Sequence, residues 1–244
     1  MLSGYHSTTT GIDSLNNLNR DRSTYFVTRT LKFFDLNIAK SYNPDSIYSV
    51  ASKELNTYIP GLAERLETSL DSLPKVEIYL YKNPTDLGLF LAIPPLPNQT
   101  GLVINQIIHV STYNLKTLEQ LVNQIFIQQK IGSNTNCFFK EGFSRYADYL
   151  LDWSVYSVDK DSTNVHLSDL TIASVNSDSH TFFSNPAACS TAGVFVKYLI
   201  DKIGLAGFKD LYARNQIDLD IKARYGYSLE QLIREFKSTL KHTS

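Results

Sequence analysis

The chain has 244 residues, of which 43% are hydrophobic and 19% are charged, and its formal net charge is −1. This composition is typical of a folded globular protein and excludes disorder for most of the chain. The 23 basic and 24 acidic residues are interspersed, so the sequence lacks the basic patch that nucleic acids and anionic membranes attract. We therefore expect neither of them as a partner.

No apolar run approaches the roughly 20 residues of a membrane span. Residues 1–22 contain few large apolar side chains and are rich in Ser, Thr and Asn, which predicts a flexible leader. Such a tether often follows a removed signal or lipid anchor, so an extracytoplasmic or surface-tethered location and a cytoplasmic one both stay open. Cys137 and Cys189 are too few for a disulfide framework. We expect two buried thiols, although a bridge between them stays open for an exported protein.

The first predicted elements alternate between helix and strand. Apolar spacings of three and four predict a long amphipathic helix over residues 44–70, which Pro60 should kink or divide into two. The alternating segment 75–81 predicts a strand. The proline-rich segment that follows this strand, residues 86–101, predicts a loop or an irregular edge. A second strand is predicted over residues 102–110, with apolar residues on both faces and therefore helices as cover.

The rest of the chain is predicted to be mainly helical. The helical period marks residues 115–130 and 140–153. Residues 157–188 are polar and predict a long surface excursion, with one short strand at 170–175. Three helical segments follow, at residues 191–204, 207–215 and 228–242, the last with Ser228 as its N-cap.

Three phrases and the order of these elements resemble the gluzincin branch of the zinc metallopeptidases, over roughly residues 25–241. In that family one helix carries H-E-x-x-H, and the next opens with a phrase such as W-x-x-E-G-x-A-x-Y, which "FFKEGFSRYADYL" matches. "AGVFVKYLIDKIG", from Ala192 to Gly204, matches a later family phrase, and "ARYGYSLEQLIREFKSTL" has the family's closing form.

The resemblance implies a zincin-like α+β fold. We expect a small mixed sheet packed on a pair of helices of the active-site type, followed by a mainly helical C-terminal half. The expected divisions are the leader 1–22, an α/β subdomain at 23–135 that ends in the motif helix, and a helical subdomain at 136–244. The two subdomains are expected to form one compact unit.

The motif itself is degenerate. In the family, two His at i and i+4 and a Glu from the next helix hold zinc, and the Glu beside the first His is the general base. Aligning "NQIFI" with that motif puts Asn123 and Ile127 at the His positions and Gln124 at the Glu position, whereas Glu141 keeps the third ligand. Asn binds metals weakly, Ile offers no lone pair and Gln accepts no proton at neutral pH. The resemblance therefore implies no catalytic residues, no zinc and no other cofactor.

Three functional hypotheses follow. The leading one is an inactive peptidase-like module that binds or scaffolds a peptide, a protein or a glycan, in a cleft lined by Asn123, Gln124, Glu141 and Tyr146. The second is a divergent metal-dependent hydrolase that uses Glu141 with loop residues such as His166 or His180. The third is a purely structural helical domain, in which Glu141 is only a helix-start carboxylate stabilised by the helix dipole. His166, Asp169, Asp178 and His180 also suggest a metal site, but their spacing fits no strong motif.

Overall fold

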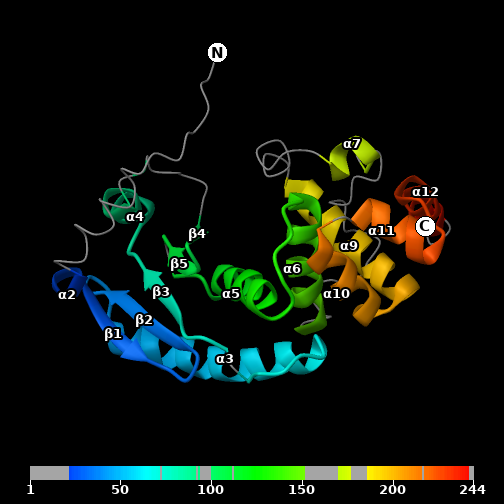
Figure 1. The fold of residues 1–244 in the computed structure, drawn as a ribbon. Helices are drawn as coiled ribbons and strands as arrows, with labels where there is room; N and C mark the ends of the chain where they lie inside the picture. The colour runs from blue at the N-terminus through cyan, green and yellow to red at the C-terminus, as the bar shows by residue number, and fades with distance from the viewer. Residues whose placement is uncertain are drawn as a thin grey trace, which may run out of the picture. The chain divides into compact units, whose positions relative to one another are not determined.

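A computed structural model describes most of the chain (Figure 1). The described residues are 22–71, 73–91, 93, 100–111, 113–151, 170–176, 186–215 and 217–241. They fall into two units. The first contains the described residues up to Tyr58 and those from Pro74 to Leu121, and the second contains Ile59–Leu73 and the described residues from Val122 onward. The expected leader up to residue 21 lies outside the described residues, as does the polar excursion predicted at 157–188 apart from residues 170–176 and 186–188.

The first unit is built on a five-stranded sheet in the order β1-β2-β3-β5-β4. Its strands are β1 (Phe26–Thr30), β2 (Phe34–Ala39), β3 (Val76–Leu80), β4 (Gly101–Ile104) and β5 (Ile107–Val110). The three central strands are parallel, and each edge strand is antiparallel to its neighbour. The sheet is therefore mixed, and with the helices described below it confirms the predicted α+β class.

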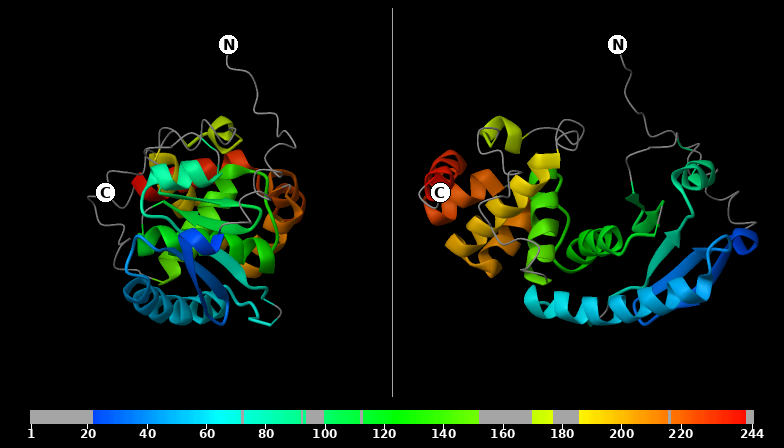
Figure 2. Two further views of the ribbon diagram at one scale, coloured as in Figure 1. Left: turned by 90° about the vertical axis from the view of Figure 1, so that its left-hand side faces the viewer. Right: turned by 180° about the vertical axis from the view of Figure 1, so that it is seen from behind.

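Helix α3 (Pro44–Arg65) belongs to the first unit up to Tyr58, and this part of it lies along one face of the sheet (Figures 1 and 2). Ala51 and Leu55 of α3 are fully buried. The sheet supplies a row of buried residues that pair across its central strands: Leu36, Ile38, Ile78, Leu80, Ile108 and Val110. Pro60 lies inside the helix, so the prediction that it could divide the helix into two was wrong. The helix ends five residues before the predicted limit because Glu67 takes a left-handed conformation, with φ of 48°.

Two local predictions in the first unit need correction, and two of its strands were not predicted. Strands β1 and β2 were missed. The strand predicted at 102–110 is two strands, since Asn105 and Gln106 have φ of 50° and 64° and form a tight turn between β4 and β5. The segment predicted as an irregular loop from residue 86 begins inside a helix, α4 (Pro84–Leu91). Asn83 caps that helix through a 2.8 Å bond from the Asp86 backbone N–H, and Pro84 suits its first position.

The second unit is helical. It contains the last turns of α3 and the part of α5 (Leu115–Lys130) that begins at Val122. The other helices of this unit are α6 (Cys137–Leu151), α7 (Ile172–Val175), α9 (Pro186–Ile203), α10 (Leu205–Arg214), α11 (Ile217–Tyr225) and α12 (Leu229–Lys241). The division between the units thus falls within α5, whereas the sequence analysis placed it after residue 135. The strand predicted at 170–175 was wrong, because Thr171 and Ser174 form a capping box that starts α7.

Helices α6 and α9 pack side by side (Figures 1 and 2), and Gly142 makes their close approach possible. A Cβ atom on Gly142 would lie 2.7 Å from the Ala192 carbonyl oxygen and 2.7 Å from Cγ2 of Val196. Both distances are well below a normal contact, and the carbonyl belongs to a helix backbone that moves only as a unit. The small residue of the "KEGF" phrase therefore sets the distance between these two helices.

We expect Gly142→Ala to lower the free energy of unfolding by about 1–3 kcal/mol, as overpacked cores do, although alanine is normally the better helix former. Gly207→Ala in α10 is the matched control. There the new methyl group would meet the Tyr225 hydroxyl, the end of a side chain that can rotate away. Urea denaturation of both variants measures the difference, and equal stabilities would show that the α6–α9 contact tolerates a larger residue.

Candidate functional site

The first group of predicted site residues lies on α5, in its part that belongs to the second unit. Asn123 is fully buried and Ile127 is 1% exposed, whereas Gln124, beside Asn123, is half-buried. The Asn123 side-chain amide donates a hydrogen bond to Oδ1 of Asp148 on α6. The position that the sequence analysis aligned with the first zinc-binding His of the gluzincins is therefore occupied by an amide that is bound to a carboxylate.

Glu141 lies on α6 and is 3% exposed. Its Oε1 atom accepts a 2.9 Å bond from Nε of Arg145, one helical turn later. Its Oε2 atom accepts a 3.3 Å bond from the side-chain amide of Gln124. Each carboxylate oxygen thus has a partner, and the negative charge is opposed by a guanidinium from the same helix.

The fold brings these residues together for local reasons. Glu141, Arg145 and Asp148 occupy positions i, i+4 and i+7 of α6 and so share one face. Asn136 starts the helix, since its side-chain oxygen accepts the Phe139 backbone N–H at 3.2 Å. We call these five side chains the polar network; it consists of the pair Asn123 and Asp148 and of the trio Gln124, Glu141 and Arg145.

Cys189 on α9 is electrostatically coupled to this network. The pKa of the Cys189 thiol is raised from 9.0 to about 12, first by burial and then by the Glu141 carboxylate, and Arg145 partly opposes the rise. The thiol is 8% exposed, whereas Cys137 is half-buried, and both are free. The thiol of Cys189 is therefore protonated at neutral pH and is a weak nucleophile.

Tyr146 is placed apart from the polar network. Five residues separate it from Glu141, which turns it about 140° around the helix axis. Its ring stacks on Phe143 at 6.1 Å, and Phe143 meets Phe208 of α10 edge-on at 5.0 Å. Burial, followed by the charges of Asp201 and Glu67, raises the pKa of its hydroxyl. The structure thus joins three of the four predicted cleft residues and sets Tyr146 in an aromatic cluster.

The residues present do not fit a zinc ion. The Glu141 carboxylate is engaged by a guanidinium and an amide, the Asn123 amide donates to Asp148, and Ile127 offers no donor atom. Among the described residues, no three His, Cys, Asp or Glu side chains are grouped so that they could hold a metal ion. His166, Asp169, Asp178 and His180 lie outside the described residues.

Arg145 and Asp148 were missed in the sequence analysis, although a signal existed. Both are printed in the phrase "KEGFSRYAD" at helical spacing from Glu141, so their shared face could have been anticipated once the helix was predicted. What the spacing could not tell is that Asn123 and Gln124 would lie opposite that face.

Comparisons with protein-family models, with curated proteins and with solved structures find no significant match to this chain. Within the described part of the chain, no helix has both the length and the apolar character that crossing a membrane needs.

Proposed function

We propose that this chain is a catalytically inactive, metallopeptidase-like domain that works as a binding or scaffolding module for a peptide, a protein or a glycan. The observation that carries the proposal is the polar network, in which Asn123, Gln124 and Glu141 stand at the positions aligned with one zinc-binding His, the general base and the third zinc ligand of the gluzincins. The flanking phrases and the order of strands and helices support the same reading, by resemblance.

The charge balance of the network argues against catalysis by the family mechanism. A third zinc ligand must offer a carboxylate lone pair to the metal, whereas the Glu141 carboxylate faces the Arg145 guanidinium at 2.9 Å. The guanidinium supplies the positive charge that zinc would otherwise bring. At the position of the general base, the neutral amide of Gln124 accepts no proton from water at neutral pH.

A binding role needs less than catalysis does. Recognition uses shape, apolar area and a few placed polar groups, and none of these requires a base or a metal ion. The network also gives α5 and α6 a fixed relative position in the second unit, because it links them through two side-chain hydrogen bonds. That rigidity favours a preformed binding surface.

The alignment can be tested by rebuilding the lost site. We expect a variant with Asn123→His, Gln124→Glu, Ile127→His and Arg145→Ala to take up about one zinc ion per chain, since two imidazoles at i and i+4 would join a released Glu141. Elemental analysis measures the zinc. The melting temperature should rise when zinc is added, because a ligand that binds only the folded state stabilises it.

The matched control carries alanine at positions 123 and 127, together with Gln124→Glu and Arg145→Ala, and is expected to bind no zinc. If both variants fold by circular dichroism and hold equal amounts of zinc, the alignment of "NQIFI" with the zinc motif is incorrect.

The unaltered protein tests the hydrolase hypothesis. Purified without chelator, it is expected to hold well below one equivalent of any transition metal and to leave casein intact. Tightly held metal, together with casein hydrolysis that Glu141→Gln abolishes, would favour the divergent hydrolase.

A further inference from the structure

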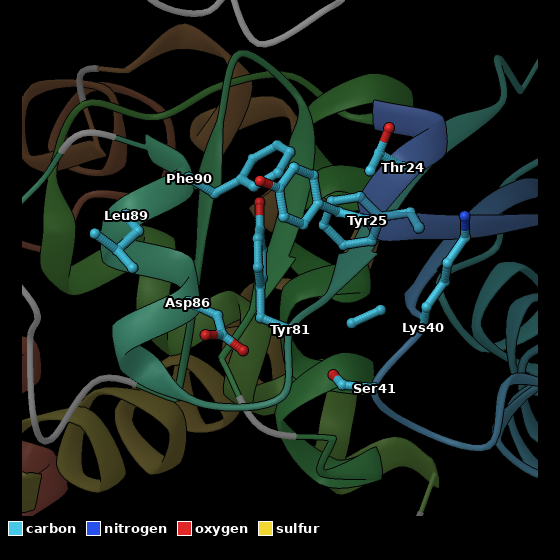
Figure 3. A pocket seen from close by; sticks show the side chains of 10 residues that line it. Thr24, Tyr25, Lys40, Ser41, Tyr81, Asp86, Leu89 and Phe90 are labelled. Atoms are coloured by element: carbon cyan, nitrogen blue, oxygen red, sulfur yellow. The ribbon is translucent and has the colours of Figure 1, made fainter. Parts of the chain in front are cut away.

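The first unit contains an open pocket of about 410 Å³ at one end of the sheet (Figure 3). It is formed by α2 (Arg22–Tyr25), the start of β1, the end of β2, the residue after β3 and α4. This volume lies within the range of small-ligand sites. All its lining residues belong to the first unit, so the pocket is separate from the polar network and the inference below does not rest on the proposed function.

The floor of the pocket consists of aromatic rings that are fixed in position. Phe26 meets Tyr81 edge-on at 5.5 Å and Phe90 edge-on at 5.0 Å. Phe26 and Tyr81 are 5% and 1% exposed. The Tyr81 hydroxyl lies 2.9 Å from Nδ1 of the buried His109, and this hydrogen bond holds the Tyr81 ring in place. Edge-to-face packing of this kind favours the addition of another ring.

The rim is apolar and exposed. Tyr25 is 58% exposed and Leu89 is 76% exposed, and Figure 3 shows the Tyr25 ring close to that of Phe90, with Leu89 on the opposite side. Covering these two side chains would remove apolar surface from water at a gain of roughly 25 cal/mol for each Å². A ligand that covers the rim would therefore gain binding free energy from burial of these two side chains, which are exposed to water in the free protein.

The two charges at the pocket have opposite signs. Lys40 donates one of its three protons to the Ser23 carbonyl at 2.7 Å. Asp86 accepts a 3.2 Å bond from the Asn83 amide. Lys40 can therefore still donate a hydrogen bond to a carbonyl oxygen of a ligand, and Asp86 can still accept one from a ligand N–H. Because the two charges have opposite signs, a strongly charged ligand would gain little net electrostatic attraction from them. A peptide backbone carries both kinds of group on either side of each side chain.

We propose that this pocket binds an aromatic side chain presented by a peptide segment, with the ring packed on Phe26, Tyr81 and Phe90 and the flanking backbone facing Lys40 and Asp86. A sugar would need an open ring face for stacking, whereas the two buried rings of the floor are already engaged: Phe26 meets Tyr81 and Phe90 edge-on, and Tyr81 is stacked on Tyr79 and His109.

The test is a titration followed by amide chemical shifts on the full chain. N-acetyl-L-tryptophanamide is expected to give saturable shifts at Tyr25, Tyr81 and Phe90 with a Kd of about 1 mM, a value within reach of one buried ring. N-acetyl-L-leucinamide, which has the same backbone, is expected to bind at least about fivefold more weakly, because it lacks the ring interactions. Cellobiose is expected to cause no shifts in these residues.

Variants locate the site. Tyr25→Ser and Leu89→Asp alter exposed rim positions and should keep the melting temperature, yet each is expected to weaken tryptophanamide binding at least about fivefold. Leu219→Asp is the matched control, since Leu219 is 70% exposed on α11 of the second unit. The proposal is overturned by an absence of saturable shifts, by equal affinity for the two amides, by rim variants that bind as well as the control, or by cellobiose shifting the pocket residues instead.

Discussion

Replacing Arg145 with alanine is expected to lower the free energy of unfolding by about 3 kcal/mol, as the loss of one partner of a buried ion pair does. The side chain of Glu141 is 4% exposed and that of Arg145 is 22% exposed, and their atoms Oε1 and Nε lie 2.9 Å apart. Without the guanidinium, the carboxylate would have no opposing charge from Arg145 in a place that water reaches poorly. Urea denaturation followed by circular dichroism measures the loss.

A double variant separates the charge from the packing. Glu141→Gln in the Arg145→Ala background removes the uncompensated charge and is expected to recover most of the loss. The matched control is Arg234→Ala, which breaks another pair at the same spacing, with Glu230 four residues before Arg234 and side chains that are 67% and 68% exposed. That control should cost at most about 0.5 kcal/mol. Equal losses for Arg145→Ala and Arg234→Ala would contradict a buried ion pair at Glu141.

The second large effect is expected in the reactivity of the two thiols. The thiolate is the species that attacks alkylating agents, and the rise in the pKa of Cys189 from 9.0 to about 12 lowers its thiolate population at pH 8 roughly a thousandfold. With its 8% exposure, Cys189 should remain unmodified while the half-buried Cys137 is labelled. Mass spectrometry after iodoacetamide treatment is expected to show one adduct on the native protein and two after denaturation.

The pH dependence of labelling has a defined sign. Because the pKa of Cys189 is raised, its labelling rate should increase about tenfold for each pH unit from 8 to about 11, as the thiolate forms. A thiol of ordinary pKa would level off above pH 9. Rapid labelling of Cys189 in the native protein at pH 8 would show that the packing around α9 leaves this thiol accessible. An absence of labelling after denaturation would reveal a disulfide.

Helical elements were predictable because their pattern is local. The limits of α5 agree with the predicted 115–130, since apolar residues three and four apart define one helix face wherever the helix packs. Ser228 caps α12 through a 3.1 Å bond from the Gln231 backbone N–H, which is again a contact between neighbours in sequence. Helix α6 begins three residues before the predicted start because the Asn136 cap was overlooked.

The sheet was harder to predict. Strands β1 and β2 have only five and six residues, and although apolar and polar residues alternate in β2 from Phe34 to Ile38, so short a pattern was missed. The turn between β4 and β5 has Gln106 where glycine is usual, so an unbroken strand was predicted across it. Strand pairing depends on residues far apart in the chain, and no local pattern contains that information.

By itself, the sequence determined the α+β class and most helices, and it pointed to Asn123, Gln124, Ile127 and Glu141 as candidate site residues. The tertiary structure decided the partners of those residues. Glu141 faces Arg145 and Gln124, and Asn123 faces Asp148, because the packing of α5 against α6 sets the contacts. Tyr146 points to another side of the same helix, and the aromatic pocket joins segments that are far apart in the chain. The periodicity of a helix or strand determines on which of its faces a residue lies. Packing between residues far apart in the chain determines which other residues contact that face.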